Sequence, residues 1–496
     1  MTGYTVEDRR RLPVIAGTGQ VANKDEDRIV HPMLLVEEAA RRALNAAGIE
    51  PRKVGGVFTS PLSALSESDP ASLLAERLGA GPGPRVVSSY SGAAPQRLLA
   101  QACRAVAEGV TEVALVAGGI ADASVRRARR RGEDPPAPPT SVWSQGSKPP
   151  GGLPKRSWAG GFRPEIAAGA GLPSSYFALV QSALDRGGDG TDRGMGLGTL
   201  LAPFTEVAAR RPAVSWFPSV RTAEEIARPS QQNRMVAEPY TKLMCSFPTV
   251  DLAAALVVTT SAAGRGLTVR PLAIVTASDA SPPSGWAAMD RPRALPAAVE
   301  EVFRLSAITP DEVARFDLYS CFPAAVLLAA SALGVDPAGP RPLTATGGLP
   351  YFGGPGASYS LHGLACLFED LQAGGAPYGA AVGVGGMLTD FSIGVYGLEE
   401  APFRSDELIV EEPPPVPAAR LAQGMAVVEA ATVLHDRDRG PVEAPVIARL
   451  PSGSRVGARC TDPALAEDLS GRNIVGRKVE LTTVDGKVYY RSPPER

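Results

Sequence analysis

The chain has 496 residues, of which 44% are hydrophobic and 21% are charged, and its formal net charge is −2. That length is sufficient for two or three domains, and the composition is that of a soluble globular protein. The small net charge excludes a general attraction to nucleic acid or to an anionic membrane. No apolar run is long enough to cross a bilayer and the polar start MTGYTVEDRRR is not a secretory signal, so we expect a cytoplasmic protein without a membrane association.

The cysteine and histidine content restricts the chemistry. Five cysteines are scattered without paired spacing, and only three histidines accompany them. An odd number of cysteines without a C-x-x-C motif argues against a disulfide framework and against a zinc site, so we expect no metal. Imidazole is the usual general base near neutral pH, so an acid–base mechanism has few candidates here.

The first half of the chain alternates strands and helices. We predict strands at 12–21 and 53–60, an amphipathic helix at 31–49, and a strand–turn–helix–strand unit at 86–119. This alternation implies a mostly parallel sheet with helices on both faces. From residue 121 to about residue 212 the sequence is rich in Arg, Pro and Gly without a steady period, which predicts an inserted loop lobe.

The second half repeats the first in outline. A strand at 316–322 precedes a helix, a glycine-rich loop runs into another helix, and two core strands join near Thr389 and Asp390. Residues 405–418 are acidic and rich in proline, which predicts a tether. The remainder has short β patterns and an Asp-Gly hairpin turn, which predict a small barrel. The predicted units are an N-terminal half, a C-terminal half, a linker and a β domain, at 1–285, 286–404, 405–418 and 419–496.

The stretch SSYSGAAPQ places Ser89, Tyr90 and Ser91 at a strand-to-helix corner. At such a corner the amides of the helix start point toward whatever binds. In one interpretation Ser89 accepts an acyl group while the Ser91 and Gly92 amides lie near the developing negative charge. In the other, Ser89 is only a polar turn residue, because a serine hydroxyl is far less acidic than a thiol and needs a positioned base.

This spacing, S-x-S-G followed by a helix and E-V-A-L-V-A-G-G, resembles the thiolase superfamily, whose motif is C-x-S-G. In that family the cysteine takes the acyl group from acyl-CoA, and Ser89 stands at its position. With the extra β domain, the chain is similar to sterol-carrier-protein-type, actinobacterial thiolase-like proteins often labelled acetyl-CoA acetyltransferases. The resemblance covers about residues 10–400. It implies a duplicated five-layer α/β fold with an inserted loop lobe, and a small C-terminal barrel of the oligonucleotide/oligosaccharide-binding (OB) type.

The resemblance also shows which family groups are altered. Tyr319 stands at the histidine of the family's H-D-C-F stretch, which helps bind the thioester oxygen, and Cys321 is retained there as a displaced nucleophile or as core. Gly353 and Gly354 lie in the glycine-rich loop where the family has G-H-P, whose histidine activates the cysteine. Gly383 fills the position of a second catalytic cysteine. Both glycine stretches are expected to line the pocket.

The remaining candidates are a histidine and several cations. His362 is the proton-transfer candidate of its half, with a hydrogen-bonded helix histidine as the alternative. Arg234 and Lys242 are candidates for binding CoA phosphates, by resemblance in position. The run RRARRR at 126–131 would meet phosphates or an acidic partner, or would simply be solvated.

The joint loss of reactive groups at Ser89, Gly354 and Gly383 indicates changed or abandoned chemistry. One hypothesis is an acyltransferase that moves an acyl group from CoA or a carrier thioester, through Ser89 or by direct attack of the acceptor. The other is a non-catalytic acyl-CoA-binding or scaffold protein that docks a partner through its C-terminal domain. A nucleic-acid role ranks last because acidic residues dilute the basic charge of the last hairpin.

These hypotheses share their expectations about ligands and partners. No covalently bound cofactor is expected, and a CoA thioester is the substrate or ligand. Family members are typically dimers or tetramers, so a homodimer stays open, although the added domain would block that surface.

Overall fold

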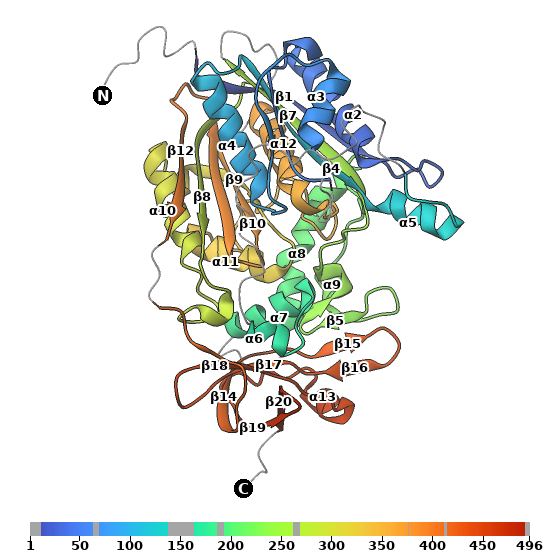
Figure 1. The fold of residues 1–496 in the computed structure, drawn as a ribbon, viewed down its shortest axis with the longest axis vertical. Coiled ribbons are helices and arrows are strands. Elements are labelled where there is room, and N and C mark those ends of the chain that lie inside the picture. Colours follow the sequence, from blue (N-terminus) through green and yellow to red (C-terminus); the bar gives the residue numbers. More distant parts are fainter. Residues whose placement is uncertain are drawn as a thin grey trace.

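The computed structural model shows three β-sheets with helices around them, and a fourth small sheet (Figure 1). It describes residues 11–62, 69–136, 163–185, 193–260, 268–374, 376–410 and 414–491. Within these ranges, no helix combines the length and apolar character that crossing a bilayer requires.

The first sheet has the strand order β1-β7-β4-β2-β3. Its strands are β1 (Pro13–Ala22), β2 (Gly56–Thr59), β3 (Arg85–Val87), β4 (Val113–Ala121) and β7 (Asp251–Thr260). The β2 strand runs parallel to β3 and β4, whereas β7 is antiparallel to β1 and β4. The sheet is therefore mixed and not mostly parallel as the alternation predicts, because β7 returns across it from the lobe.

The second sheet has the order β12-β8-β11-β10-β9. Its strands are β8 (Arg270–Ser278), β9 (Val313–Leu318), β10 (Tyr378–Gly385), β11 (Asp390–Gly397) and β12 (Arg404–Ile409). The β10 and β11 strands form the predicted pair joined near Thr389 and Asp390, and such a short connection requires antiparallel pairing.

Helices form three layers with these two sheets. Helices α2 (Pro32–Ala47) and α3 (Pro70–Leu78) cover the first sheet, while α10 (Ala294–Ser306) and α11 (Pro323–Leu333) cover the second. Helices α4 (Ala94–Ala107) and α12 (Tyr359–Gln372) contact strands of both sheets and lie between them (Figure 1). Both central helices are buried around most of their circumference, as a helix between two sheets must be. The predicted duplicated α/β architecture is confirmed.

Two strands pair outside the units predicted for them. The β8 strand precedes residue 285 but belongs to the second sheet, and β12 overlaps the predicted linker at 405–418 yet pairs with β8. The β8 residues are almost all buried, so their apolar run is satisfied only in a sheet interior. The β12 strand lies at the exposed edge of the sheet. Its acidic side chains therefore remain in contact with solvent although they belong to a strand.

The residues between β4 and β7, from 122 to 250, form what we call the lobe. Its elements are α5 (Asp122–Arg131), α6 (Pro164–Ala167), α7 (Pro173–Leu184), α8 (Arg193–Ala209), α9 (Ala223–Ala227), β5 (Met235–Ala237) and β6 (Tyr240–Thr241). The described part of the predicted loop region is thus largely helical, and the stretch 137–162 lies outside the described residues. Short 3₁₀ turns occur at Pro51–Lys53, Lys242–Met244, Pro283–Gly285, Pro310–Glu312 and Gly356–Ser358.

The C-terminal domain is a six-stranded sheet of order β13-β18-β17-β14-β19-β20. Its elements are β13 (Ala418–Ala419), β14 (Gly424–Ala431), β17 (Val446–Arg449), β18 (Arg455–Ala458), α13 (Pro463–Leu469), β19 (Lys478–Val484) and β20 (Lys487–Arg491). The predicted Asp-Gly turn joins β19 to β20, with positive φ at Asp485 and Gly486. The predicted closed barrel is not formed by the strand pairs, although a bridge between Arg459 and Tyr489 brings β20 beside the end of β18.

The lobe and the C-terminal domain share a sheet. Strands β15 (Leu434–Asp436) and β16 (Gly440–Glu443) extend from the C-terminal domain and continue the β5–β6 pair of the lobe. A small apolar cluster crosses the same boundary and includes Leu179 and Ala183 of α7 and Ile447 of β17. The two parts therefore form one packed unit.

A buried arginine fixes the C-terminal domain to the second half. Arg455 has no exposed surface, and its guanidinium donates to Glu429 at 2.5 Å and to the carbonyl of Ser284 at 3.0 Å. It also donates to the carbonyls of Trp286 and Ala287. These carbonyls lie before α10, so one side chain satisfies several acceptors across the boundary.

We expect Arg455→Met to lower the free energy of unfolding by about 3–5 kcal/mol, because it leaves buried carbonyls without a donor. Thermal unfolding followed by circular dichroism measures this loss. Arg449→Met is the matched control, since Arg449 pairs with the same Glu429 at 2.8 Å but is partly exposed and does not cross the boundary. Its cost should stay below about 1 kcal/mol. Equal losses for the two variants would contradict a docking role for Arg455.

Candidate active site

The predicted corner lies between the end of β3 and the start of α4. Ser88 is buried, Ser89 is half-buried, and Tyr90 exposes 44% of its surface. The Ser88 amide donates to the carbonyl of Thr59 at 3.0 Å, which fixes the corner beside the end of β2. At that strand end the buried hydroxyls of Thr59 and Ser60 have no hydrogen-bond partner among the described residues. The corner is thus polar and reaches the surface.

Some backbone amides of the corner have no acceptor within the described part of the chain. The amides of Ala93 and Ala94 donate to the hydroxyl and the carbonyl of Ser91, at 3.2 and 3.1 Å. In contrast, the amides of residues 89–92 donate no hydrogen bond within the described part of the chain. Successive N–H groups at a helix start carry partial positive charge and can stabilise a negatively charged oxygen.

Ser91 ties the corner to the second sheet. Its hydroxyl donates to Asp390 at 2.5 Å, and Asp390 also accepts from Arg97 at 3.0 Å and from Ser278 at 3.2 Å. A Cβ at Gly385 would lie 1.9 Å from the Ser91 hydroxyl, so glycine is required where β10 passes the corner. From the sequence, Asp390 is identified only as part of a strand junction. Asp390 lies 299 residues after Ser91, so no local pattern predicts their contact.

Tyr319 brings its phenol from the end of β9 to the corner. A Cβ at Gly92 would lie 2.6 Å from the Tyr319 hydroxyl, so the two touch only because residue 92 is glycine. The hydroxyl makes no hydrogen bond among the described residues. Burial raises the pKa of Tyr319 well above its ordinary value, and nearby Cys321 and Tyr90 raise it further. Tyr319 is therefore a neutral donor and not a base.

Tyr90 supplies a second phenol, for which the sequence gave no role. Its hydroxyl packs against Gly356, where a Cβ would lie 2.2 Å away. Burial, and after it the charge of Asp122, raises the pKa of Tyr90. Both tyrosines at the corner therefore keep their protons near neutral pH.

The C-terminal domain and the overall structure both have relatives. A family model described as the additional C-terminal domain of thiolase-like protein type 1 matches residues 407–487. A solved structure of a monomeric SCP2-thiolase like protein type 1 from Mycobacterium smegmatis aligns with a TM-score of 0.80 at 25% identity. The alignment covers 98% of this chain and 99% of that one. The chain is thiolase-like.

Other relatives share the thiolase-like part. An acetyl-CoA acetyltransferase of Methanocaldococcus jannaschii is 26% identical over 298 residues, which are 58% of this chain and 67% of the relative. The Ltp2-ChsH2(DUF35) aldolase shares the fold with a TM-score of 0.57 at 19% identity, covering 78% of this chain and 98% of that one. An acetyl-CoA acetyltransferase from Syntrophomonas wolfei shares the fold with a TM-score of 0.55 at 15% identity, covering 78% and 99%.

The glycine positions of the thiolase-like site are closely packed. A Cβ at Gly354 would lie 2.2 Å from the Ser246 hydroxyl, and one at Gly383 would lie 2.5 Å from the Ser392 hydroxyl. Gly353 has a φ of +110°, which disfavours a side chain there. At Gly383 such a Cβ would also lie 2.9 Å from the Gly92 carbonyl oxygen, so backbone closes the space there. At Gly354 the next atom after the Ser246 hydroxyl is 3.4 Å away, so rotation of that serine would make room for a side chain.

His362 lies in the core and not at the corner. Its Nδ1 is 2.8 Å from the side-chain oxygen of Gln20, and its ring packs 5.1 Å from that of Phe352. Burial lowers the pKa of His362 to about 3, so the imidazole is neutral near pH 7. The proposed role in proton transfer at Ser89 has no support in these contacts, and the alternative of a hydrogen-bonded helix histidine describes them.

Cys321 also forms no hydrogen bond with Ser89 in the described part of the chain. The same is true of the two predicted CoA-binding cations, Arg234 and Lys242. Burial raises the pKa of the Cys321 thiol, so it stays protonated and is a weak nucleophile. Arg234 donates to the carbonyl of Met235 at 3.0 Å and lines a cleft beside the C-terminal domain, whereas Lys242 is exposed. Within the predicted run at 126–131, Arg127 is buried against Asp251.

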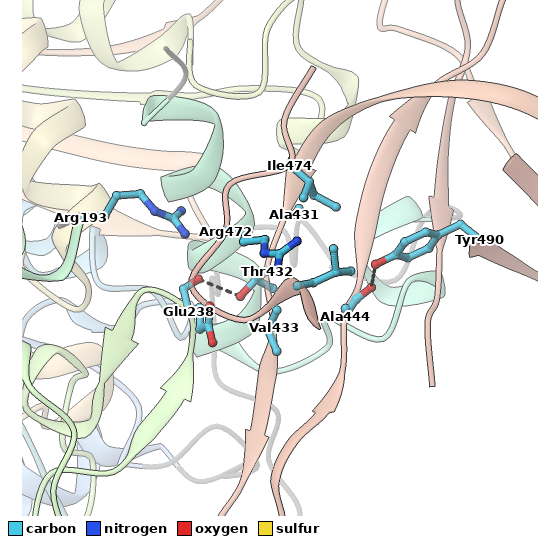
Figure 2. Close-up of a pocket in the computed structure, with 10 residues that line it drawn as sticks. Arg193, Glu238, Ala431, Thr432, Val433, Ala444, Arg472, Ile474 and Tyr490 are labelled. Carbon is cyan, nitrogen blue, oxygen red and sulfur yellow. Dashed lines mark hydrogen bonds between the residues drawn. The ribbon is translucent and has the colours of Figure 1, made fainter. Parts of the chain in front are cut away.

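Two cavities are described, and neither contains Ser89. Both lie between the lobe and the C-terminal domain, and one of them is shown in Figure 2. In the described ranges, no group of three or more His, Cys, Asp or Glu residues is arranged to hold a metal ion.

Asp317 fixes the glycine-rich loop beneath the site. It is buried on β9, and one oxygen accepts from the Ala345 amide at 2.9 Å and from the Thr344 hydroxyl at 3.2 Å. The other oxygen packs so closely on α12 that a Cβ at Gly363 would lie 2.0 Å away. Burial outweighs these hydrogen bonds and raises the pKa of Asp317 to about 6.

We expect Asp317→Asn to stabilise the fold at pH 8 but not at pH 4. Between its ordinary pKa of 3.8 and about 6, folded Asp317 holds a proton that the unfolded chain has lost, so stability falls as the pH rises. At pH 8 the buried carboxylate costs on the order of 3 kcal/mol, and asparagine keeps the acceptor without the charge. Melting temperatures of both proteins at the two pH values measure the effect. A variant that is less stable at pH 8 than at pH 4, relative to the wild type, contradicts it.

Proposed function

We propose that this thiolase-like chain binds an acyl-CoA or a carrier thioester at the corner and transfers its acyl group to an acceptor. The observation that carries the proposal is the row of amides at residues 89–92, which donate no hydrogen bond within the described chain and adjoin the neutral phenol of Tyr319. Such donors suit the oxygen of a thioester as it becomes negative. The curated relative named acetyl-CoA acetyltransferase supports the same substrate class.

Direct attack by the acceptor is favoured over a covalent intermediate on Ser89. The hydroxyl of Ser89 has no hydrogen bond to a base among the described residues, and His362 is buried against Gln20. A serine without a base is a poor nucleophile. Bringing an amine acceptor and a thioester together can give useful rates without an acyl-enzyme intermediate. The amine nitrogen bonds to the acyl carbon, the C–S bond breaks, and the CoA thiolate leaves and takes the proton that the nitrogen loses.

The second candidate function is a non-catalytic protein that binds acyl-CoA. The observation that favours it is the packing of Gly383, where a Cβ would lie 2.5 Å from the Ser392 hydroxyl and 2.9 Å from the Gly92 carbonyl oxygen. In this case the C-terminal domain would dock a partner. Its strand order, the helix α13 before β19 and the bridge of β20 to the end of β18 support an OB-like domain. We propose a cytoplasmic monomer, in keeping with the monomeric protein from Mycobacterium smegmatis.

Mixing the protein with acetyl-CoA tests the proposal. We expect acetyl-CoA to raise the melting temperature of the wild type and of Ser89→Ala equally, with no acetyl adduct in the intact mass of either. Ser88→Ala is the matched control, because Ser88 is the neighbouring residue and its hydroxyl donates only to the Ser89 carbonyl. An acetyl adduct on the wild type and on Ser88→Ala, but not on Ser89→Ala, would contradict direct attack and support a covalent intermediate on Ser89. If millimolar acetyl-CoA produced no stabilisation and no adduct, that result would contradict thioester binding.

Tyr319→Phe removes the phenol donor and keeps the ring. We expect turnover of acetyl-CoA with a small amine acceptor to fall by about 10- to 100-fold, the usual effect of losing one hydrogen bond to a developing charge. The melting temperature should stay unchanged, since the hydroxyl has no described partner. Tyr359→Phe is the contrast, because Tyr359 is 2.6 Å from the Thr346 hydroxyl and its loss should lower stability. Unchanged turnover in Tyr319→Phe would exclude the phenol from the reaction.

A further inference from the structure

A cleft with a volume of about 620 Å³ opens between the lobe and the C-terminal domain. Its walls come from the start of α8, the loop between α9 and β5, the β15–β16 hairpin and the residues after α13. This volume lies within the range of pockets that hold small-molecule ligands. The lobe and the additional domain each supply one side, so the cleft exists only while they are docked.

Arginines dominate the charged lining of the cleft. They come from three separate segments and are Arg193, Arg228, Arg234 and Arg437. The acidic residues in the lining are Glu238 and Asp436. Four cations against two anions leave a positive excess, and arginine forks pair with phosphate through two parallel hydrogen bonds.

The negative charge of Glu238 is already satisfied within the protein. Its carboxylate lies 2.8 Å from Nε2 of His435 and accepts from the Ser470 hydroxyl at 2.5 Å and from the Gly471 amide at 2.6 Å. Burial by itself raises the pKa of Glu238, but these hydrogen bonds outweigh it, so the pKa lies below its ordinary value. Glu238 is therefore ionised near neutral pH, and its oxygens face protein donors. It orients the cleft wall and does not neutralise the arginines.

The negative charge of Asp436 is also satisfied within the protein. It accepts from the amides of Asp438 and Arg439 at 3.0 and 3.2 Å, and it forms an ion pair with the Arg439 side chain at 3.4 Å. The carboxylate nearest to Arg193 in an ion pair is Asp185, at 3.8 Å, which is a loose contact. Among the described residues, the two acids of the lining are therefore paired with groups other than Arg234 and Arg437.

The boundary next to the cleft is closely packed. A crevice of about 10 Å³ shares Arg193 and Glu238 with the cleft and has no room for a ligand. Figure 2 shows its residues, with Thr432 donating to the Glu238 carbonyl and Tyr490 donating to the Ala444 carbonyl. The Thr432 contact joins the C-terminal domain to the lobe, whereas the Tyr490 contact lies within the C-terminal domain.

We propose that this cleft is a second binding site, which takes a phosphate-bearing small molecule of nucleotide size. The site goes beyond the proposed function, because it does not contain Ser89 and requires the additional domain. The phosphate has two sources of the same chemistry, the nucleotide end of CoA or a free organic phosphate. In either case the ligand contacts both domains and stabilises their docking.

Isothermal titration calorimetry on the full-length chain tests the site, with pyrophosphate, ADP, CoA and phosphate-free pantetheine as probes. We expect ADP and CoA to bind, and pantetheine not to compete with ADP. The double variant Arg234→Gln/Arg437→Gln should weaken ADP binding at least tenfold, and raising the salt concentration should weaken ADP binding to the wild type. The matched control is Arg126→Gln/Arg130→Gln, which removes the same charge from the exposed face of α5 and should bind ADP as the wild type does.

The outcomes separate this site from the corner. If CoA binds more tightly than ADP, and Arg234→Gln/Arg437→Gln weakens CoA binding, the nucleotide end of CoA is the source of the phosphate. If CoA and ADP bind equally, the source is a free organic phosphate. If the wild type binds ADP but shows no turnover of acetyl-CoA, the cleft is supported and the proposed transferase is contradicted. ADP binding by Tyr319→Phe should equal that of the wild type, because Tyr319 does not line the cleft. No binding of any phosphate probe, or equal ADP affinity in the two double variants, overturns the cleft proposal. Unchanged circular dichroism melting curves show that both double variants are folded.

Discussion

The structure depends on charged groups that are buried across the boundary between the additional domain and the rest of the chain. Arg455 and Glu238 are almost inaccessible to solvent, and an ion in such a place is tolerated only if each of its polar atoms has a partner. Arg455 meets Glu429 and backbone carbonyls before α10, and Glu238 meets donors after α13. Because these partners have fixed directions, they define one docked arrangement, whereas an apolar interface tolerates sliding. The cleft between the domains inherits its shape from that arrangement.

The corner depends on a similar constraint between the two halves. Tyr319 of the second half touches Gly92 of the first, and the Ser91 hydroxyl reaches Asp390 next to Gly385. These contacts require glycine, because a Cβ at either glycine would overlap a hydroxyl oxygen. The two glycines are therefore required by contacts between the halves.

The sequence predicted what local patterns control. The alternating elements, the strand-to-helix corner at Ser89 and the Asp485-Gly486 turn follow from periodicity and backbone preference, and the structure contains all three. Contacts between distant residues were not predictable. Burial of His362 against Gln20 arises from packing of α12 on β1, some 340 residues apart in sequence. The same holds for Arg234, which shares a cleft with Arg437 although nothing in either segment marks the other. The pairing of β8 in the second sheet depends on β11, which comes much later in the chain.

The protonation states of groups at the corner and in the core behind it limit what chemistry the corner can perform. Burial raises the pKa of the Tyr319 phenol and of the Cys321 thiol, and it lowers the pKa of His362, so each of these groups is neutral near pH 7. Neutral donors and helix-start amides polarise a carbonyl, but they do not remove a proton from a weak nucleophile. In the proposed transfer the acceptor therefore has to arrive already nucleophilic, as an amine does in its free-base form. An alcohol acceptor would need a base, and the described contacts of Ser89 include none. A binding protein is also compatible with this neutrality, because the corner supplies no base to activate a water molecule for hydrolysis.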